Sequence, residues 1–105
     1  MNDVAESRAY AVAFAGRSRP VPVSSTKAHF GHCLGAAGAL EAAVTVIAIR
    51  CGALFPTLRL GNPVKCPEVD WLKGGPRRQP LPVAMSVSAG FGGSNAALVL
   101  GACPA

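Results

Sequence analysis

The residues with the clearest chemical potential lie close together between Thr26 and His32. Lys27 brings an ammonium group, and His32, five residues later, brings an imidazole that can donate a hydrogen bond from one fixed nitrogen. A run of small apolar residues follows at once, which predicts a helix. Enzymes commonly hold reactive side chains on a short loop against a rigid element. We therefore predict that this polar loop carries chemistry.

His32 is the leading candidate because a preorganised N–H donor stabilises an oxygen that gains negative charge, by about 3–4 kcal/mol per donor. The alternative is a structural histidine at the N-terminus of the next helix, where the helix dipole disfavours the imidazolium. The two roles are compatible. For Lys27 the alternative is a loop lysine that pairs with a nearby acid, and His29 is expected to be a loop or surface histidine.

A glycine-rich turn near the end of the chain is the second candidate region. Phe91 lies within the turn from Ala89 to Asn95, which joins two expected strands, Val83–Ser88 and Ala96–Leu100. Glycines permit positive φ and the close approach of a backbone or ligand. Taken alone, however, this segment favours a plain hairpin turn with one core aromatic residue.

The remaining elements must position these two regions. We expect a first helix from about Val4 to Ala15, with Asp3 and Glu6 as a capping box and Gly16 as its stop. Tyr10 and Phe14 are four residues apart and share a face. Short strands are expected at Val21–Ser25 and around Val69–Leu72, separated by proline-rich loops in which Trp71 packs rather than reacts.

The long second helix begins at about His32 or Leu34 and runs to Arg50, with Gly52 as its C-terminal stop. Nearly all its sides are apolar, which predicts burial all round. The small residues from Gly35 to Gly38 lower helix propensity, and we expect them to allow another backbone to approach closely.

The composition indicates one globular domain over residues 1–105, with 50% apolar and 14% charged residues and a net charge of +5. The most apolar run, 42–49, is too short to cross a bilayer, and the N-terminus has no signal-peptide pattern, so we expect a cytoplasmic protein. The charge favours either an acidic partner or a solvated arginine-rich surface. No basic run interleaves with aromatics, which argues against nucleic acid.

The four cysteines show no C-x-x-C pair and no zinc-like spacing to histidine, so we expect no metal site and reduced thiols. Cys33 and Cys51 are expected to be small buried hydrophobes on the long helix. Cys33 lies beside His32, but adjacent residues point in different directions, which argues against a nucleophile–base pair.

Two long motifs resemble one family. SSTKAHFGHCLGAAGALEA, residues 24–42, and SVSAGFGGSNAALVL, residues 86–100, resemble the C-terminal part of the β-ketoacyl synthases, the condensing enzymes of fatty-acid and polyketide synthesis. The family usually has NSFGFGGTNA in the second segment. The run PTLRLGNP, residues 56–63, and the initial NDVAE extend the similarity over nearly the whole chain.

The resemblance implies an α/β fold, the C-terminal half-domain of the thiolase-like αβαβα layered fold. It implies that His32 acts in malonyl decarboxylation, that Lys27 supports it, and that Phe91 gates the acyl pocket and helps to form the oxyanion hole. Substrate-binding positions are expected at Thr26, Gly90, Gly92 and Gly93. The implied partners are an acyl carrier protein, which delivers the phosphopantetheine arm so that no other cofactor is needed, and a second subunit in a homodimer or heterodimer of the full-length parent.

The family's cysteine nucleophile and first histidine lie upstream of the matched region, so the chain is expected to be a fragment that is inactive alone. Val87 and Ala89 replace the family's usual asparagine and phenylalanine, next to the gate. The alternative function is therefore a non-catalytic, ketosynthase-like or chain-length-factor-like module that acts through dimerisation or carrier-protein binding.

Overall fold

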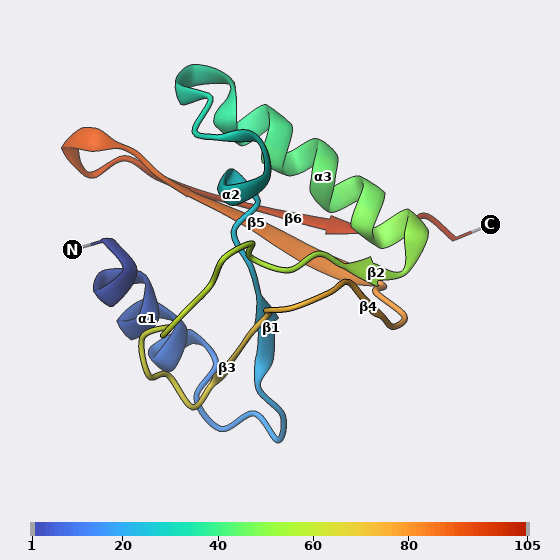
Figure 1. The fold of residues 1–105 in the computed structure, drawn as a ribbon, viewed down its shortest axis with the longest axis horizontal. Helices are drawn as coiled ribbons and strands as arrows, with labels where there is room; N and C mark the ends of the chain where they lie inside the picture. Colours follow the sequence, from blue (N-terminus) through green and yellow to red (C-terminus); the bar gives the residue numbers. More distant parts are fainter. Residues whose placement is uncertain (1, 105) are drawn as a thin grey trace.

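The computed structural model describes residues 2–104 and shows a mixed α/β arrangement in which one long helix lies along a β-hairpin (Figure 1). The helices are α1 (Asn2–Ala13), α2 (Lys27–Phe30) and α3 (Ala37–Cys51), with 3₁₀ turns at Leu34–Ala36 and Phe91–Gly93. The strands are β1 (Val21–Val23), β2 (Ala53–Leu54), β3 (Val69–Trp71), β4 (Arg77–Arg78), β5 (Val83–Ala89) and β6 (Asn95–Gly101).

The strands form three two-stranded sheets. β1 and β3 pair in parallel, and β2 and β4 pair antiparallel, so both short sheets are closed by segments far apart in the sequence. β5 and β6 form an antiparallel hairpin in which Met85 lies opposite Val99. The expected strands at 21–25, 69–72, 83–88 and 96–100 are confirmed within a residue or two, while β2 and β4 were not expected because two-residue strands leave no periodic pattern.

α1 begins and ends two residues earlier than expected, and the capping box is not formed. Glu6 instead accepts a hydrogen bond from the Asn2 side chain at 2.9 Å, so its carboxylate is engaged along the helix surface. Tyr10 and Phe14 do share a face, with ring centroids 5.9 Å apart. The Tyr10 ring also lies 6.3 Å from that of Trp71, which confirms that Trp71 packs and ties α1 to β3.

α3 ends as expected, because Gly52 adopts φ 56° and ψ 45°, a left-handed conformation that glycine takes without steric cost, and its N–H bonds back to the last turn. Its start is later than expected. Leu34 has φ 48°, outside the right-handed helical region, so the chain passes through a 3₁₀ turn before the α-helix begins at Ala37.

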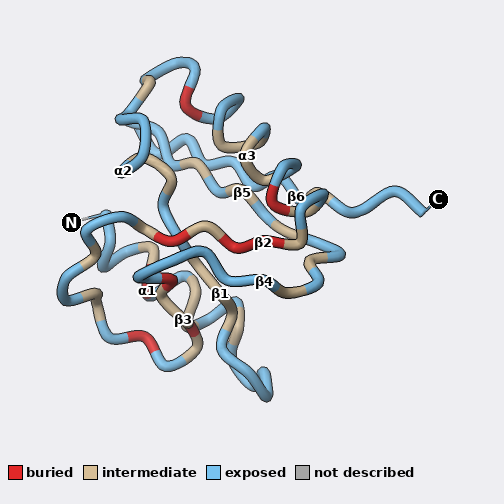
Figure 2. Tube along the Cα trace, turned by 45° about the vertical axis from the view of Figure 1, so that its right-hand side comes forward, coloured by how far each residue is buried: buried red, intermediate tan, exposed pale blue. Residues whose placement is uncertain are grey.

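The core of the described chain is small, and α3 is mostly exposed (Figure 2). Only Ala37 and Ala48 of this helix are buried, so the prediction of burial all round is wrong for the chain by itself. Cys33 is half-buried and Cys51 is exposed, so their expected burial is also wrong. Gly38 faces the Ser88 side chain and Gly35 faces open space, so within residues 2–104 no other backbone lies close to the Cβ position of either glycine.

By length and composition, the 18 residues from Leu34 to Cys51 are apolar enough to span a membrane, contrary to the expectation drawn from the shorter run 42–49. The same test is passed by core helices of soluble proteins. In this structure one side of α3 lies on the β5–β6 hairpin, which gives the helix a packing role.

Candidate functional site

The predicted polar loop contains a short helix, α2, which places Lys27 at its first residue and His29 two residues later. Gly31 ends α2 with φ 83°, and its N–H donates to the Lys27 carbonyl at 2.8 Å. This tight reversal delivers His32 directly after the helix. Thr26 precedes α2 and is half-buried, and its side chain makes no capping hydrogen bond.

His32 is exposed, and its ring has one defined contact. The backbone N–H of Leu34 donates to His32 Nδ1 at 3.2 Å. A nitrogen that accepts a hydrogen bond carries no proton, so the neutral ring holds its proton on Nε2. The local turn therefore selects the tautomer in which Nε2–H is free to donate to a substrate oxygen. The predicted structural role, at a helix start, and the predicted chemical role are both compatible with this contact.

Lys27 forms an ion pair with Glu41, which lies on α3. The Lys27 side chain is 40% exposed and that of Glu41 only 12%, so the carboxylate is the more desolvated partner. The alternative in which Lys27 pairs with a nearby acid is thus realised. Glu41 was not among the predicted site residues. Its signal in the sequence is that it is the one acid in a mostly apolar helix, where an unpaired carboxylate would be costly.

His29 is exposed, as expected for a surface histidine, but it belongs to α2 rather than to a loop. Its Nε2 lies 2.8 Å from the carbonyl oxygen of Pro56. Just before α2, the Ser25 N–H donates to Thr57 Oγ1 at 2.8 Å. Pro56 and Thr57 were also missed as site residues, because long-range pairing of a side chain with a backbone carbonyl leaves no local sequence pattern.

The glycine-rich turn between β5 and β6 exposes Phe91 completely, so it is not a core aromatic residue of this chain. Gly92 and Gly93 adopt φ values of 79° and 85°, which non-glycine residues rarely adopt. Gly90 is extended, and its N–H donates to the Ser94 carbonyl at 2.7 Å, which closes the turn. The expected use of glycine conformational freedom is confirmed at positions 92 and 93.

The two predicted regions lie at the same end of the helix–hairpin layer. Gly38, at the start of α3, faces Ser88, at the end of β5, so the His32 segment and the Phe91 turn extend from neighbouring points. Within residues 2–104, no hydrogen bond joins the two regions, and the side chains of His32 and Phe91 are both exposed. The structure thus gathers the candidates on one open surface rather than in an enclosed site.

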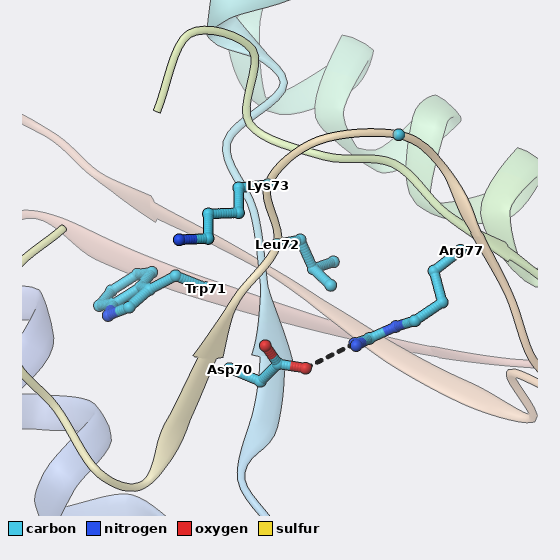
Figure 3. Close-up of a pocket in the computed structure, with 6 residues that line it drawn as sticks. Asp70, Trp71, Leu72, Lys73 and Arg77 are labelled. Atoms are coloured by element: carbon cyan, nitrogen blue, oxygen red, sulfur yellow. Dashed lines mark hydrogen bonds and ion pairs between the residues drawn. The ribbon is translucent and has the colours of Figure 1, made fainter. Parts of the chain in front are cut away.

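Two cavities lie elsewhere. One, of about 210 Å³, is lined by residues of the segment from Asp70 to Arg77, where Asp70 accepts a 2.7 Å hydrogen bond from the Arg77 guanidinium (Figure 3). The other, of about 530 Å³, lies between the end of α3 and residues 100–103. Neither contains Lys27, His32 or Phe91. Across the described residues, no three His, Cys, Asp or Glu side chains are grouped to hold a metal ion.

Comparison with known proteins shows the family. Residues 1–61 match the model of the β-ketoacyl synthase C-terminal domain. The chain is 43% identical over 98 residues to 3-oxoacyl-[acyl-carrier-protein] synthase 2 of Coxiella burnetii, covering 93% of this chain and 24% of the relative. It is 38% identical over 99 residues to the tetracenomycin polyketide synthase ketoacyl synthase alpha subunit of Streptomyces glaucescens, covering 94% and 23%.

A solved structure agrees. A chain from a complex of a type II polyketide synthase acyl-carrier protein with its ketosynthase, bound to the hexaketide, superposes with a TM-score of 0.89 at 27% identity, over 98% of this chain and 25% of that chain. The chain therefore belongs to the β-ketoacyl synthase family, in which it matches the C-terminal domain, and the expected α/β ketosynthase fold is confirmed. It spans about a quarter of the length of the curated relatives it matches.

Proposed function

We propose that this chain supplies one half of the active site of a 3-oxoacyl-[acyl-carrier-protein] synthase. The observation that carries the proposal is the His32 contact, in which Leu34 N–H occupies Nδ1 and leaves Nε2–H free on an exposed surface. A donor fixed before the substrate arrives stabilises developing charge without reorganisation. The parent reaction is a decarboxylative Claisen condensation of an acyl thioester with malonyl-acyl carrier protein.

In this reaction, the bond between the malonyl carboxylate and the central carbon breaks, and carbon dioxide leaves. The electron pair remains as an enolate, whose negative charge rests largely on the thioester oxygen. His32 Nε2–H donates to that oxygen and lowers the energy of the enolate. The carbanion then attacks the acyl thioester carbonyl of the enzyme cysteine, which leaves as a thiolate. In this proposal, the other part of the synthase supplies that cysteine and a second histidine.

Exposed apolar faces support completion by further protein. The outer face of the hairpin carries Val83, Met85, Val87 and Val99, which are between 37% and 63% exposed. Residues of α3, including Val46 and Ile47, are similarly exposed. Apolar faces of this kind usually mark protein interfaces. We propose that the remaining three quarters of a synthase cover them and bring its nucleophile to His32.

The proposed partner in the reaction is an acyl carrier protein, whose phosphopantetheine arm brings the malonyl group. Support comes from the matched ketosynthase, which was solved in complex with its acyl-carrier protein, and from the net charge of +5. The positive charge favours association with an acidic partner. We propose no metal or redox cofactor, because the chemistry described needs none.

The test replaces the C-terminal quarter of the Coxiella burnetii relative with residues 2–105, giving what we call the grafted synthase. We expect it to form 3-oxoacyl product from acyl- and malonyl-acyl carrier protein, measured by mass spectrometry. A folded, dimeric grafted synthase that loads the acyl group but forms no product would contradict the proposal. That outcome would favour the alternative, a non-catalytic module. Val87 and Ala89, which replace the family's usual asparagine and phenylalanine near Phe91, also favour this alternative.

A further inference from the structure

The short helix α2 is not stable without contacts to other parts of the chain. It has four residues, and its preceding residue, Thr26, makes no side-chain capping bond. A single turn of helix is unstable by itself, because the entropy cost of forming it exceeds the gain from so few hydrogen bonds. The placement of Lys27, and of His32 two residues beyond the end of α2, must therefore come from contacts with other segments.

Those contacts come from two sides. On one side, the ion pair between Lys27 and Glu41 ties α2 to α3. On the other side, His29 Nε2 donates to the Pro56 carbonyl at 2.8 Å, and Ser25 N–H donates to Thr57 Oγ1 at 2.8 Å. His29 is two residues from Lys27, so the two side chains leave the helix in different directions.

The segment that receives His29 and Ser25 is itself firmly held. Thr57 N–H donates to the Leu72 carbonyl at 2.9 Å, and Leu72 N–H donates to the Val23 carbonyl at 2.9 Å. Pro56 and Leu72 are buried. A continuous path of hydrogen bonds therefore runs from β1 through Leu72 and Thr57 back to Ser25, and it gives α2 a rigid base.

We propose that His29 and Thr57 are positioning residues, which hold α2 so that Lys27 and His32 are aimed at the substrate. The family resemblance assigns no role to either residue. The inference rests on the proposed function of His32. Both neutral and protonated imidazole can donate from Nε2, so the His29 contact does not depend on a change of charge. Its role is geometric.

The first test uses matched pairs in the grafted synthase. His29→Leu and Thr57→Val remove the hydrogen-bonding groups, whereas His29→Gln and Thr57→Ser retain them. We expect kcat for malonyl decarboxylation to fall about tenfold or more in the first pair, since small misplacements of reacting groups are costly. Acyl loading and KM for malonyl-acyl carrier protein should stay within about twofold. The conservative pair should recover most of the decarboxylation rate.

The second test needs no activity. The chain has two histidines, so ¹⁵N-histidine NMR of the 105-residue chain resolves each ring, with His29→Gln to assign them. We expect His32 to show the Nε2–H tautomer, and His29→Leu to shift it towards a mixture. If the isolated chain does not fold, both rings will resemble free imidazole, and the same spectra are then recorded on the grafted synthase.

The outcomes separate the two proposals. Decarboxylation within twofold of the parent in both His29→Leu and Thr57→Val, with an unchanged His32 tautomer, would overturn the positioning role and leave the proposed function intact. Equal loss of acyl loading and decarboxylation, without recovery in the conservative pair, would also overturn it, because it would indicate general unfolding. Failure of His32→Ala to affect decarboxylation would instead refute the proposed function.

Discussion

The Lys27 ammonium and the Glu41 carboxylate, fourteen residues apart, form an ion pair that joins α2 to α3. The pair is asymmetric, because Glu41 is largely covered while Lys27 is more open to solvent. Removing the lysine would leave a desolvated carboxylate without a partner, which is more costly than removing an exposed charge. The two residues should therefore respond differently to substitution.

We predict that Glu41→Gln in the grafted synthase preserves the fold, because the side chain keeps its size and hydrogen-bonding ability. The freed Lys27 and α2 should shift, and malonyl decarboxylation should fall by up to about a hundredfold through misplacement alone. Lys27→Ala should lower both acyl loading and decarboxylation, since its charge acts on the whole site. Rapid-quench assays of each half-reaction measure these effects. A Glu41→Gln enzyme with the parent decarboxylation rate would show that the pair is only structural.

Much of the fold was predictable because it rests on local signals. The hairpin at 83–101 follows from alternating residues around a glycine-rich turn, and the end of α3 follows from Gly52. The candidate residues Lys27 and His32 were found from residue type and spacing, and the structure does bring them onto one continuous segment. Their proposed roles remain predictions.

The site residues that sequence analysis did not find are those whose contacts join segments far apart in the chain. The contacts of Glu41, Pro56 and Thr57 with the α2 segment join residues 14 to 32 positions apart, and no periodic pattern encodes them. The burial of α3 was mispredicted for a different reason. An all-apolar helix indicates cover on every side, but the pattern does not say whether the cover comes from the same chain.

A second prediction concerns Cys66, the one buried cysteine among the four. Burial raises the pKa of the Cys66 thiol above its ordinary value of 9.0, and a hydrogen bond to the Glu68 carboxylate raises it further. Thiolates are the reactive form. Iodoacetamide at pH 8 should therefore label Cys51 and Cys103 quickly and Cys66 at the rate of unfolding, measured by peptide mass spectrometry.

The raised pKa of Cys66 also determines how folding stability changes with pH. The folded state holds the Cys66 proton more tightly than the unfolded state, so this contribution to stability is fully present below pH 9 and is lost as the pH rises through the folded pKa. Cys66→Ser should weaken this alkaline loss. Equal labelling of all four cysteines in native buffer would show that the isolated chain does not form the α1–β3 region.

Gly52 gives a prediction about stability. Its φ of 56° is strained for other residues, and an added Cβ would lie 3.3 Å from the Gln79 carbonyl oxygen. We expect Gly52→Ala to destabilise the grafted synthase by about 1–2 kcal/mol, seen as a lower Tm in calorimetry. Gly75→Ala is the matched control, because its added Cβ meets open space. An equal Tm for both variants would refute the assignment.

The isolated 105-residue chain should show no condensing activity. Among the described residues no hydrogen bond joins a thiol to His32; the Cys33 thiol instead donates to the Phe30 and Gly31 carbonyl oxygens, at 3.9 and 4.0 Å. Purified chain mixed with acyl- and malonyl-acyl carrier protein should give no 3-oxoacyl product, with the grafted synthase as the positive control. Product formed by the chain alone, and lost on Cys33→Ala, would overturn this expectation.

The final prediction separates the two halves of catalysis at His32. In the grafted synthase, His32→Ala removes the Nε2–H donor and should slow malonyl decarboxylation by about 10²–10³-fold, the usual cost of losing one oxyanion donor. Acyl loading should stay within about threefold, because it depends on the cysteine and its own oxyanion donors.

His32→Gln is the informative companion to this variant, because its amide can still donate while no ring nitrogen accepts from Leu34. If donation alone matters, His32→Gln should recover part of the decarboxylation rate, whereas the loss of the Leu34 contact should keep it below the parent. Release of ¹⁴CO₂ from labelled malonyl-acyl carrier protein measures the first step, and single-turnover acylation measures loading. Unchanged CO₂ release in a well-folded His32→Ala enzyme would mean that this chain retains the motif without its chemical role.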